Sequence, residues 1–112
     1  MKKIDLTNWN RRLHYHHFIA LNDPFFAVTI PFDVSIAYKN AKDNNYSFFA
    51  TYLHACMKAV NHTENFKYRI IDNEVFELEV IHASATIARE DHTFGFSYVN
   101  FTENFKEFNV NL

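Results

Sequence analysis

The apolar pattern changes its period near residue 62, and this change constrains the fold more than any other feature of the sequence. Before it, residues 47–62 repeat apolar side chains at spacings of three and four, which predicts an amphipathic helix with Ser47 as its N-cap. The apolar stripe of this helix consists of Phe49, Leu53, Cys56, Met57 and Val60. After it, residues 68–71 and 75–81 alternate on a period of two, which predicts a β-hairpin that turns at Asp72 and Asn73. A helix followed by paired strands predicts an α+β fold.

Shorter elements are predicted before and after this pattern. Residues 11–21 are expected to form a helix, and residues 33–40 a second helix that Asp33 caps. Between them, residues 25–32 are rich in aromatic and β-branched side chains, which predicts a strand that Pro31 confines to a sheet edge or ends. The remaining expected elements are a strand over 84–89, a strand over 94–98 and the start of a helix over 102–108.

Composition excludes several classes of partner. The 112 residues are enough for one domain, and their formal net charge of -2 provides no field that would attract nucleic acid. No apolar run approaches the ~20 residues that span a bilayer, and the polar N-terminus has no apolar segment behind it. A single cysteine, Cys56, cannot form an intramolecular disulfide. We therefore expect a soluble, cytoplasmic protein that binds neither membrane nor nucleic acid.

The sequence offers no self-contained active site. His14, His16 and His17 are close in sequence, but on a helix only His14 and His17 share a face, so we expect no metal site. Cys56 lies on the apolar stripe and is expected to be a buried structural residue rather than a nucleophile. Six of the 13 phenylalanines fall in three short groups, and 18% of all residues are aromatic. These groups, at 25–26, 48–49 and 94–96, favour a packed core over the alternative of a pocket for a flat apolar ligand.

Short motifs in a fixed order resemble the first half of the chloramphenicol acetyltransferase family. Trp9, Arg11, Arg12, His14 and Phe18 are similar to its Trp-x-Arg-Arg/Lys-Glu-His-Phe opening. Further stretches with matching spacing are 26–34, 46–61, 66–74, 90–94 and 101–108. The resemblance covers nearly the whole chain and implies that residues 1–112 form the N-terminal half of a CoA-dependent acyltransferase fold, a mixed sheet with helices packed on it.

The resemblance also implies a function. The family transfers acetyl groups from acetyl-CoA, its co-substrate, to a hydroxyl of chloramphenicol, an antibiotic-resistance reaction that needs no covalently bound cofactor. Its members are trimers with active sites between subunits. The catalytic His-His-x-x-x-Asp-Gly motif of the family does not occur in residues 1–112, so we expect no catalytic residue here and no activity of this chain alone.

Some supporting positions of the family are nevertheless matched. Arg11 matches the arginine that pairs with the aspartate of the absent motif, and His17, Phe18, Ala85 and Phe94 match positions that line the acceptor pocket. His17 stands in place of an aromatic hydrocarbon ring and Ala85 in place of a hydroxyl residue, so the pocket departs from the pattern that binds chloramphenicol.

A second hypothesis is a non-catalytic half-fold that binds a ligand or associates with itself. Half of a fold must expose the faces that the other half would cover, and such patches associate. Under both hypotheses we expect a homo-oligomer, a trimer by resemblance or a dimer that pairs edge to edge.

Overall fold

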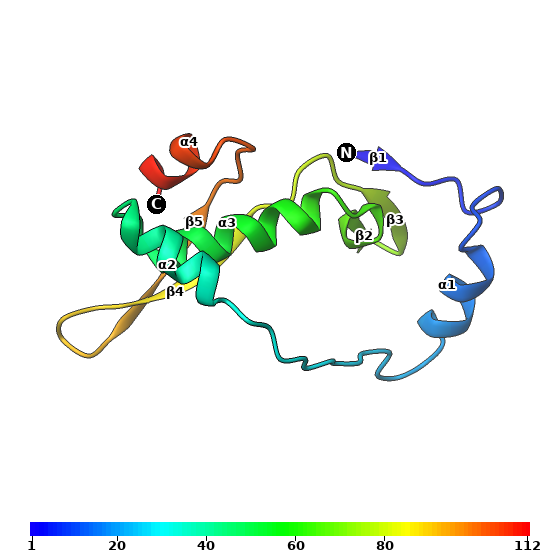
Figure 1. Cartoon of the computed structure of the whole chain (residues 1–112). Coiled ribbons are helices and arrows are strands. Elements are labelled where there is room, and N and C mark those ends of the chain that lie inside the picture. The colour runs from blue at the N-terminus through cyan, green and yellow to red at the C-terminus, as the bar shows by residue number, and fades with distance from the viewer.

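The computed structural model describes residues 1–112 and confirms the α+β class. Figure 1 shows α3 in the middle of an elongated molecule, with the β4–β5 hairpin and α1 toward opposite ends. The elements, in chain order, are β1 (Lys2–Lys3), α1 (Arg12–Ile19), α2 (Ser35–Asp43), α3 (Phe48–Asn61), a 3-10 helix (Glu64–Lys67), β2 (Tyr68–Ile71), β3 (Glu74–Glu77), β4 (Ala83–Ala88), β5 (Phe94–Val99) and α4 (Phe105–Val110).

Two of the four α-helices, α3 and α4, begin at a polar side-chain cap, whereas α1 and α2 have none. The Ser47 hydroxyl accepts a hydrogen bond from the Ala50 amide at 3.3 Å, which confirms the predicted cap of α3. Asp33 accepts hydrogen bonds from the amide and hydroxyl of Ser35, but α2 starts after Val34 and continues to Asp43, beyond the predicted end. Asn104 caps α4 through the amides of Lys106 and Glu107.

The predicted hairpin forms, and the strands expected over 84–89 and 94–98 pair as a second hairpin in a separate antiparallel sheet. The first sheet has the order β1-β3-β2, and its turn places Asp72 and Asn73 at φ 51° and 63°. Two successive left-handed residues are typical of a type I′ turn. The second sheet contains only β4 and β5, in a register from Ala83 opposite Val99 to Ala88 opposite Phe94. Both edges of this second sheet are therefore open.

The core is small for a chain of this length. Met57, Val99 and Phe108 form its buried cluster, and Leu53, Ala83, Phe101 and Phe105 pack around it. Only 7 of the 112 residues are buried, and the radius of gyration is 17.8 Å. A compact domain of this length would have a radius of about 13 Å. The chain is thus an open assembly of elements rather than a closed domain. No helix in it is both long and apolar enough to cross a membrane.

Three predictions about individual segments are wrong. Residues 25–32 form no strand, because no other strand of the chain lies beside them to accept their backbone hydrogen bonds. Cys56 is exposed, because α3 turns Ala50, His54 and Met57 toward the core instead. The expected burial of the phenylalanine groups also fails at 25–26 and 94–96, where every phenylalanine is exposed.

Candidate functional site

The candidate residues near the N-terminus gather around α1. Arg11 is the residue before the first turn of α1, and none of the ion pairs in the chain involves its side chain. Arg11 and Phe18 line a shallow hollow of about 290 Å³ together with Trp9 and Ile70. His17 and Phe18 contact each other edge to face, with 5.0 Å between ring centroids, and line a second hollow on α1. These candidates therefore form one continuous surface with a free guanidinium at its edge.

Trp9 connects this surface to the first hairpin. Its ring contacts Tyr68 of β2 edge to face at a centroid distance of 5.1 Å and Tyr15 of α1 at 6.3 Å. A hydrogen bond from the Tyr68 hydroxyl to the Glu64 carboxylate raises the pKa of the phenol. These edge-to-face and tilted ring contacts hold α1 against β2.

The other candidates lie on the second hairpin, on opposite faces. Ala85 of β4 pairs with Ser97, and Phe94 of β5 pairs with Ala88, three positions away along β4. Side chains alternate between the faces of a strand, and directly opposed residues share a face. Ala85 is half-buried, whereas Phe94 is exposed and contacts Phe96 at a centroid distance of 5.8 Å.

The chain does not bring its two groups of candidate residues together. Figure 1 shows α1 and the β4–β5 hairpin on opposite sides of α3, in a molecule 51 Å long. One copy of this chain therefore presents two partial surfaces, one with Arg11, His17 and Phe18 and another with Ala85 and Phe94.

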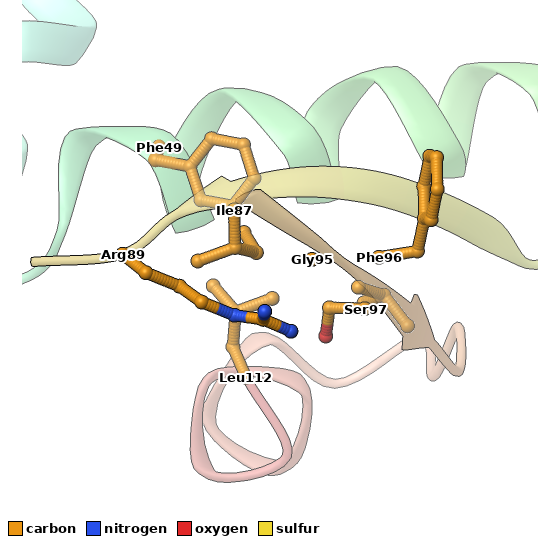
Figure 2. Close-up of a pocket in the computed structure, with 8 residues that line it drawn as sticks. Phe49, Ile87, Arg89, Gly95, Phe96, Ser97 and Leu112 are labelled. Atoms are coloured by element: carbon orange, nitrogen blue, oxygen red, sulfur yellow. The ribbon is translucent and has the colours of Figure 1, made fainter. Parts of the chain in front are cut away.

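A hollow that sequence reasoning missed lies between α3 and the second hairpin. Figure 2 shows the Arg89 side chain lying across β5 at Gly95, beside Leu112 and below Phe49. The hollow has a volume of about 280 Å³. A Cβ atom at Gly95 would lie 2.3 Å from Arg89 Nη2, so the single glycine of the chain permits this arginine to lie against the strand. The fit of Arg89 against Gly95 depends on how the two sides of the hairpin pair. The spacing of residues in the sequence therefore gives no direct signal of this hollow.

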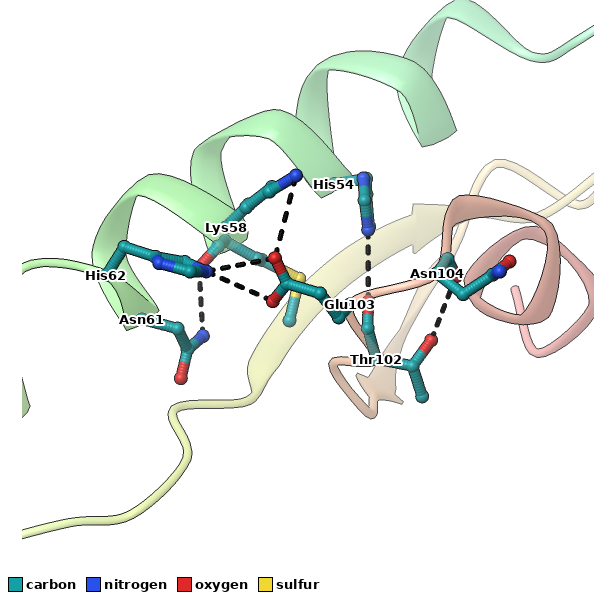
Figure 3. A network of polar contacts seen from close by, with 8 residues as sticks. His54, Lys58, Asn61, His62, Thr102, Glu103 and Asn104 are labelled. Atoms are coloured by element: carbon teal, nitrogen blue, oxygen red, sulfur yellow. Dashed lines mark hydrogen bonds and ion pairs between the residues drawn. The ribbon is translucent and has the colours of Figure 1, made fainter.

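A polar network also escaped prediction, and it fixes α3 to the segment that follows β5. In Figure 3, His54 Nε2 lies 3.0 Å from the Thr102 carbonyl oxygen, and His62 Nε2 lies 2.9 Å from Glu103 Oε1. Lys58 Nζ lies 3.5 Å from the same carboxylate. The hydrogen bond from His62 is the main reason why the pKa of Glu103 is lowered. His54 is one of the few buried residues, so this histidine is structural.

Asn61 adds a second attachment of α3. Its side-chain amide donates to the Met57 and Ile81 carbonyl oxygens and accepts from the Ile81 amide, at distances of 2.7–2.9 Å. No three His, Cys, Asp or Glu side chains gather in a way that could hold a metal ion. The polar groups of α3 therefore fix the helix to the segments around Ile81 and Thr102–Glu103.

Comparisons with known proteins agree with the observed fold. A sequence model described as chloramphenicol acetyltransferase matches residues 1–112. The chain is 27% identical to a chloramphenicol acetyltransferase of Bacillus pumilus, over 96% of this chain and 49% of that protein. It is 26% identical to one from Campylobacter coli, over 95% of this chain and 50% of that protein. A solved structure of a chloramphenicol acetyltransferase superposes with a TM-score of 0.93 and 28% identity, over 98% of this chain and 52% of that one.

Proposed function

The chain belongs to the chloramphenicol acetyltransferase family, and from this premise we propose that it is the N-terminal half of an acetyl-CoA-dependent O-acetyltransferase. The observation that carries the proposal is the match over residues 1–112 together with the length of the relatives, since the chain spans about half of each. The remaining half of such an enzyme supplies the general base and the donor that stabilises the oxyanion.

In the proposed reaction, acetyl-CoA is the co-substrate and a chloramphenicol-like hydroxyl compound is the acceptor. The base removes the hydroxyl proton as the oxygen attacks the thioester carbonyl, and the coenzyme A thiol leaves as the acetyl ester forms. The residues of this chain bind and orient the acceptor. A cytoplasmic, antibiotic-resistance role follows from the family, and the single unpaired cysteine agrees with a reducing compartment.

Arg11 is the proposed positioning residue for the absent motif. Its guanidinium makes no ion pair within the chain, and Arg11 is one of the residues that line the hollow with Trp9 and Phe18. A guanidinium presents two parallel N–H donors that match a carboxylate. We propose that Arg11 receives the aspartate of the motif and thereby orients the loop that carries the catalytic histidine.

The acceptor pocket is proposed to take residues from two chains. His17 and Phe18 lie on α1, whereas Ala85 and Phe94 lie on the distant β4–β5 hairpin. An active site between subunits, as the family resemblance implies, can combine α1 of one chain with the hairpin of the next. A trimer with threefold symmetry provides this arrangement three times, and it is the proposed assembly of the complete enzyme.

Two assays of thiol release from acetyl-CoA, with chloramphenicol as acceptor, test the proposal. The 112-residue chain alone should give no turnover above the uncatalysed rate. A chimera that joins residues 1–112 to the second half of the Bacillus pumilus relative should release thiol, and Arg11→Ala should lower its kcat by at least about tenfold, the size expected of a lost positioning contact. Turnover by the chain alone, or a folded chimera without activity, would contradict the proposal.

A non-catalytic, ligand-binding half-fold is the alternative, and the hollow at Arg89 favours it. This hollow combines the guanidinium of Arg89 with the apolar side chains of Phe49, Ile87 and Leu112. Such a mixture suits a ligand with an anionic group on an apolar body. An inactive chimera together with saturable binding of such a ligand to the 112-residue chain would support this alternative.

A further inference from the structure

The segment that carries Arg11 is attached to the rest of the chain mainly through aromatic side chains. Every hydrogen bond of residues 5–21 stays within that segment, and none of the ion pairs of the chain involves it. One ring contact leaves the segment, between Trp9 and Tyr68 of β2, with 5.1 Å between centroids and 74° between ring planes. The position of the whole segment therefore depends strongly on this contact.

Arg11 lies between two residues whose rings take part in this attachment. The Arg12 amide donates to the Trp9 carbonyl oxygen at 3.1 Å and closes a turn around Arg11. The Arg11 carbonyl oxygen accepts from the Tyr15 amide at 2.9 Å. The rings of Trp9 and Tyr15 also contact each other, at a centroid distance of 6.3 Å. The backbone of Arg11 is thus tied on both sides to the ring cluster of Trp9, Tyr15 and Tyr68.

Tyr68 is the fixed member of this ring cluster. Its hydroxyl donates to the carboxylate of Glu64, which begins the 3-10 helix after α3. This hydrogen bond raises the pKa of the phenol, which keeps the phenol in its neutral, donating form. The backbone of Tyr68 pairs with Glu77 of β3. Tyr68 is therefore held both through its backbone and at the end of its side chain.

We propose that Tyr68 is a positioning residue for Arg11. The inference rests on the proposed function, in which the Arg11 guanidinium receives an aspartate of the second half. Two parallel N–H donors must meet two carboxylate oxygens, so a small displacement of the guanidinium weakens the pair. An edge-to-face ring contact has a preferred geometry, so Tyr68 can define where Trp9, and with it Arg11, lies. Tyr68 acts through Trp9 and contacts no reacting atom.

The relaxation of backbone amides by NMR tests this positioning in the 112-residue chain without any assay of activity. The Arg11 amide should be rigid in the wild type, with an order parameter of about 0.85, and should fall below about 0.6 in Tyr68→Ile, which keeps a strand-forming residue but removes the ring. Tyr68→Phe keeps the ring and should keep Arg11 rigid. Ile71→Ala is the matched control, since Ile71 of β2 lies on the face opposite Tyr68.

The chimera with the second half of the Bacillus pumilus relative gives the kinetic readout. Tyr68→Ile should lower kcat about tenfold and change the KM for acetyl-CoA less than about twofold, because the ring positions Arg11 and binds no substrate. Tyr68→Phe should stay within about threefold of the wild-type kcat. In an Arg11→Ala background, Tyr68→Ile should cost less than about twofold more, since a residue that acts through Arg11 has nothing left to position.

The possible outcomes separate this inference from the proposed function. A rigid Arg11 in Tyr68→Ile, or a loss of kcat that simply multiplies that of Arg11→Ala, overturns the inference and leaves Tyr68 a structural residue. A folded chimera without activity, or one whose kcat Arg11→Ala leaves unchanged, contradicts the proposed function and overturns the inference with it. If circular dichroism shows that Tyr68→Ile does not fold, Trp9→Leu removes the same ring contact and is held to the same expectations.

Discussion

Cys56 is exposed because one polar residue, His54, takes a place on the buried face of α3 and turns that face away from the apolar stripe. The buried residues of α3 are Ala50, His54 and Met57. At about 100° per residue, Cys56 lies about 120° around the helix from Ala50. His54 takes a central place on the buried face because its ring reaches the Thr102 carbonyl oxygen. A hydropathy pattern counts histidine as polar and so leaves His54 off the buried face. The buried face that it predicts for α3 is therefore rotated toward Cys56.

The exposure of Cys56 leads to a prediction about its reactivity. We expect a water-soluble disulfide reagent to modify Cys56 in the native chain at a rate within about tenfold of the rate in the urea-unfolded chain, because exposure rather than packing controls access. Absorbance of the released thiolate measures both rates at one pH. Val60→Cys in a Cys56→Ser background places a thiol at a half-buried position of the same helix and should react more slowly. Equal protection at both positions would contradict the observed orientation of α3.

Glu103 leads to a prediction about acid stability. The hydrogen bond from His62 and the charge of Lys58 lower the pKa of Glu103 below its ordinary value of 4.5. A carboxyl group with a lowered pKa in the folded state stabilises that state above its ordinary pKa, and the contribution is lost as the pH falls through the lowered value. Wild-type stability should therefore fall below pH 4.5 more steeply than that of Glu103→Gln. Urea unfolding followed by circular dichroism at several pH values measures the difference, which should be small because all three side chains are exposed. Parallel curves for the two proteins would exclude the pairing.

At the scale of elements, the β2–β3 hairpin depends on the left-handed backbone of its turn. Asp72 and Asn73 have positive φ angles, which asparagine and aspartate tolerate better than other residues with a Cβ. Asn73→Val should therefore destabilise the hairpin by about 1–2 kcal/mol, whereas Asn73→Gly should be neutral or slightly stabilising. Fluorescence of Trp9, whose ring contacts Tyr68 of β2, reports the unfolding of this hairpin. Equal stability of the two variants would contradict a type I′ turn.

The elements that sequence predicted correctly are those whose causes are local. The Ser47 cap and the turn at Asp72 and Asn73 between two alternating stretches each depend on neighbours in sequence. Residues 25–32 have the local properties of a strand, but a strand also needs a partner, and the chain supplies none. Local pattern therefore predicted the propensity of this segment and could not predict its pairing.

In the candidate site too, sequence predicted the features with local causes and missed those that depend on tertiary contacts. The motifs identified α1 and the second hairpin as carriers of site residues, yet they held no information on the separation of the two. Arg89 follows β4 and lies against Gly95 of β5 across the turn of the hairpin, and the contact of His62 with Glu103 joins residues 41 positions apart. Such contacts depend on how the elements pack in three dimensions, and the pattern of a single sequence does not predict that packing.

At the scale of the whole molecule, the chain divides into two regions with little between them. Trp9, Tyr15 and the first sheet form one region, and the cluster of Met57, Val99 and Phe108 forms the other. The C-terminal part of α3 and the amide of Asn61 join them. Cooperative unfolding requires that the unfolding of one region destabilises the other. The buried cluster has only three residues, so the two regions are weakly coupled.

We therefore expect the monomeric chain to unfold in two steps. Measurement at a concentration where light scattering gives a monomeric mass keeps association from obscuring the result. Urea unfolding should give one midpoint by Trp9 fluorescence, which reports the first region, and a different midpoint by circular dichroism at 222 nm, which reports mainly α3. α3 should unfold at a higher urea concentration than the first region, because the buried cluster of the chain packs against this helix. In the chimera with a second family half, the exposed faces are covered, so the two midpoints should coincide and rise. Coincident, steep transitions in the 112-residue chain would show that its two regions are coupled without a partner.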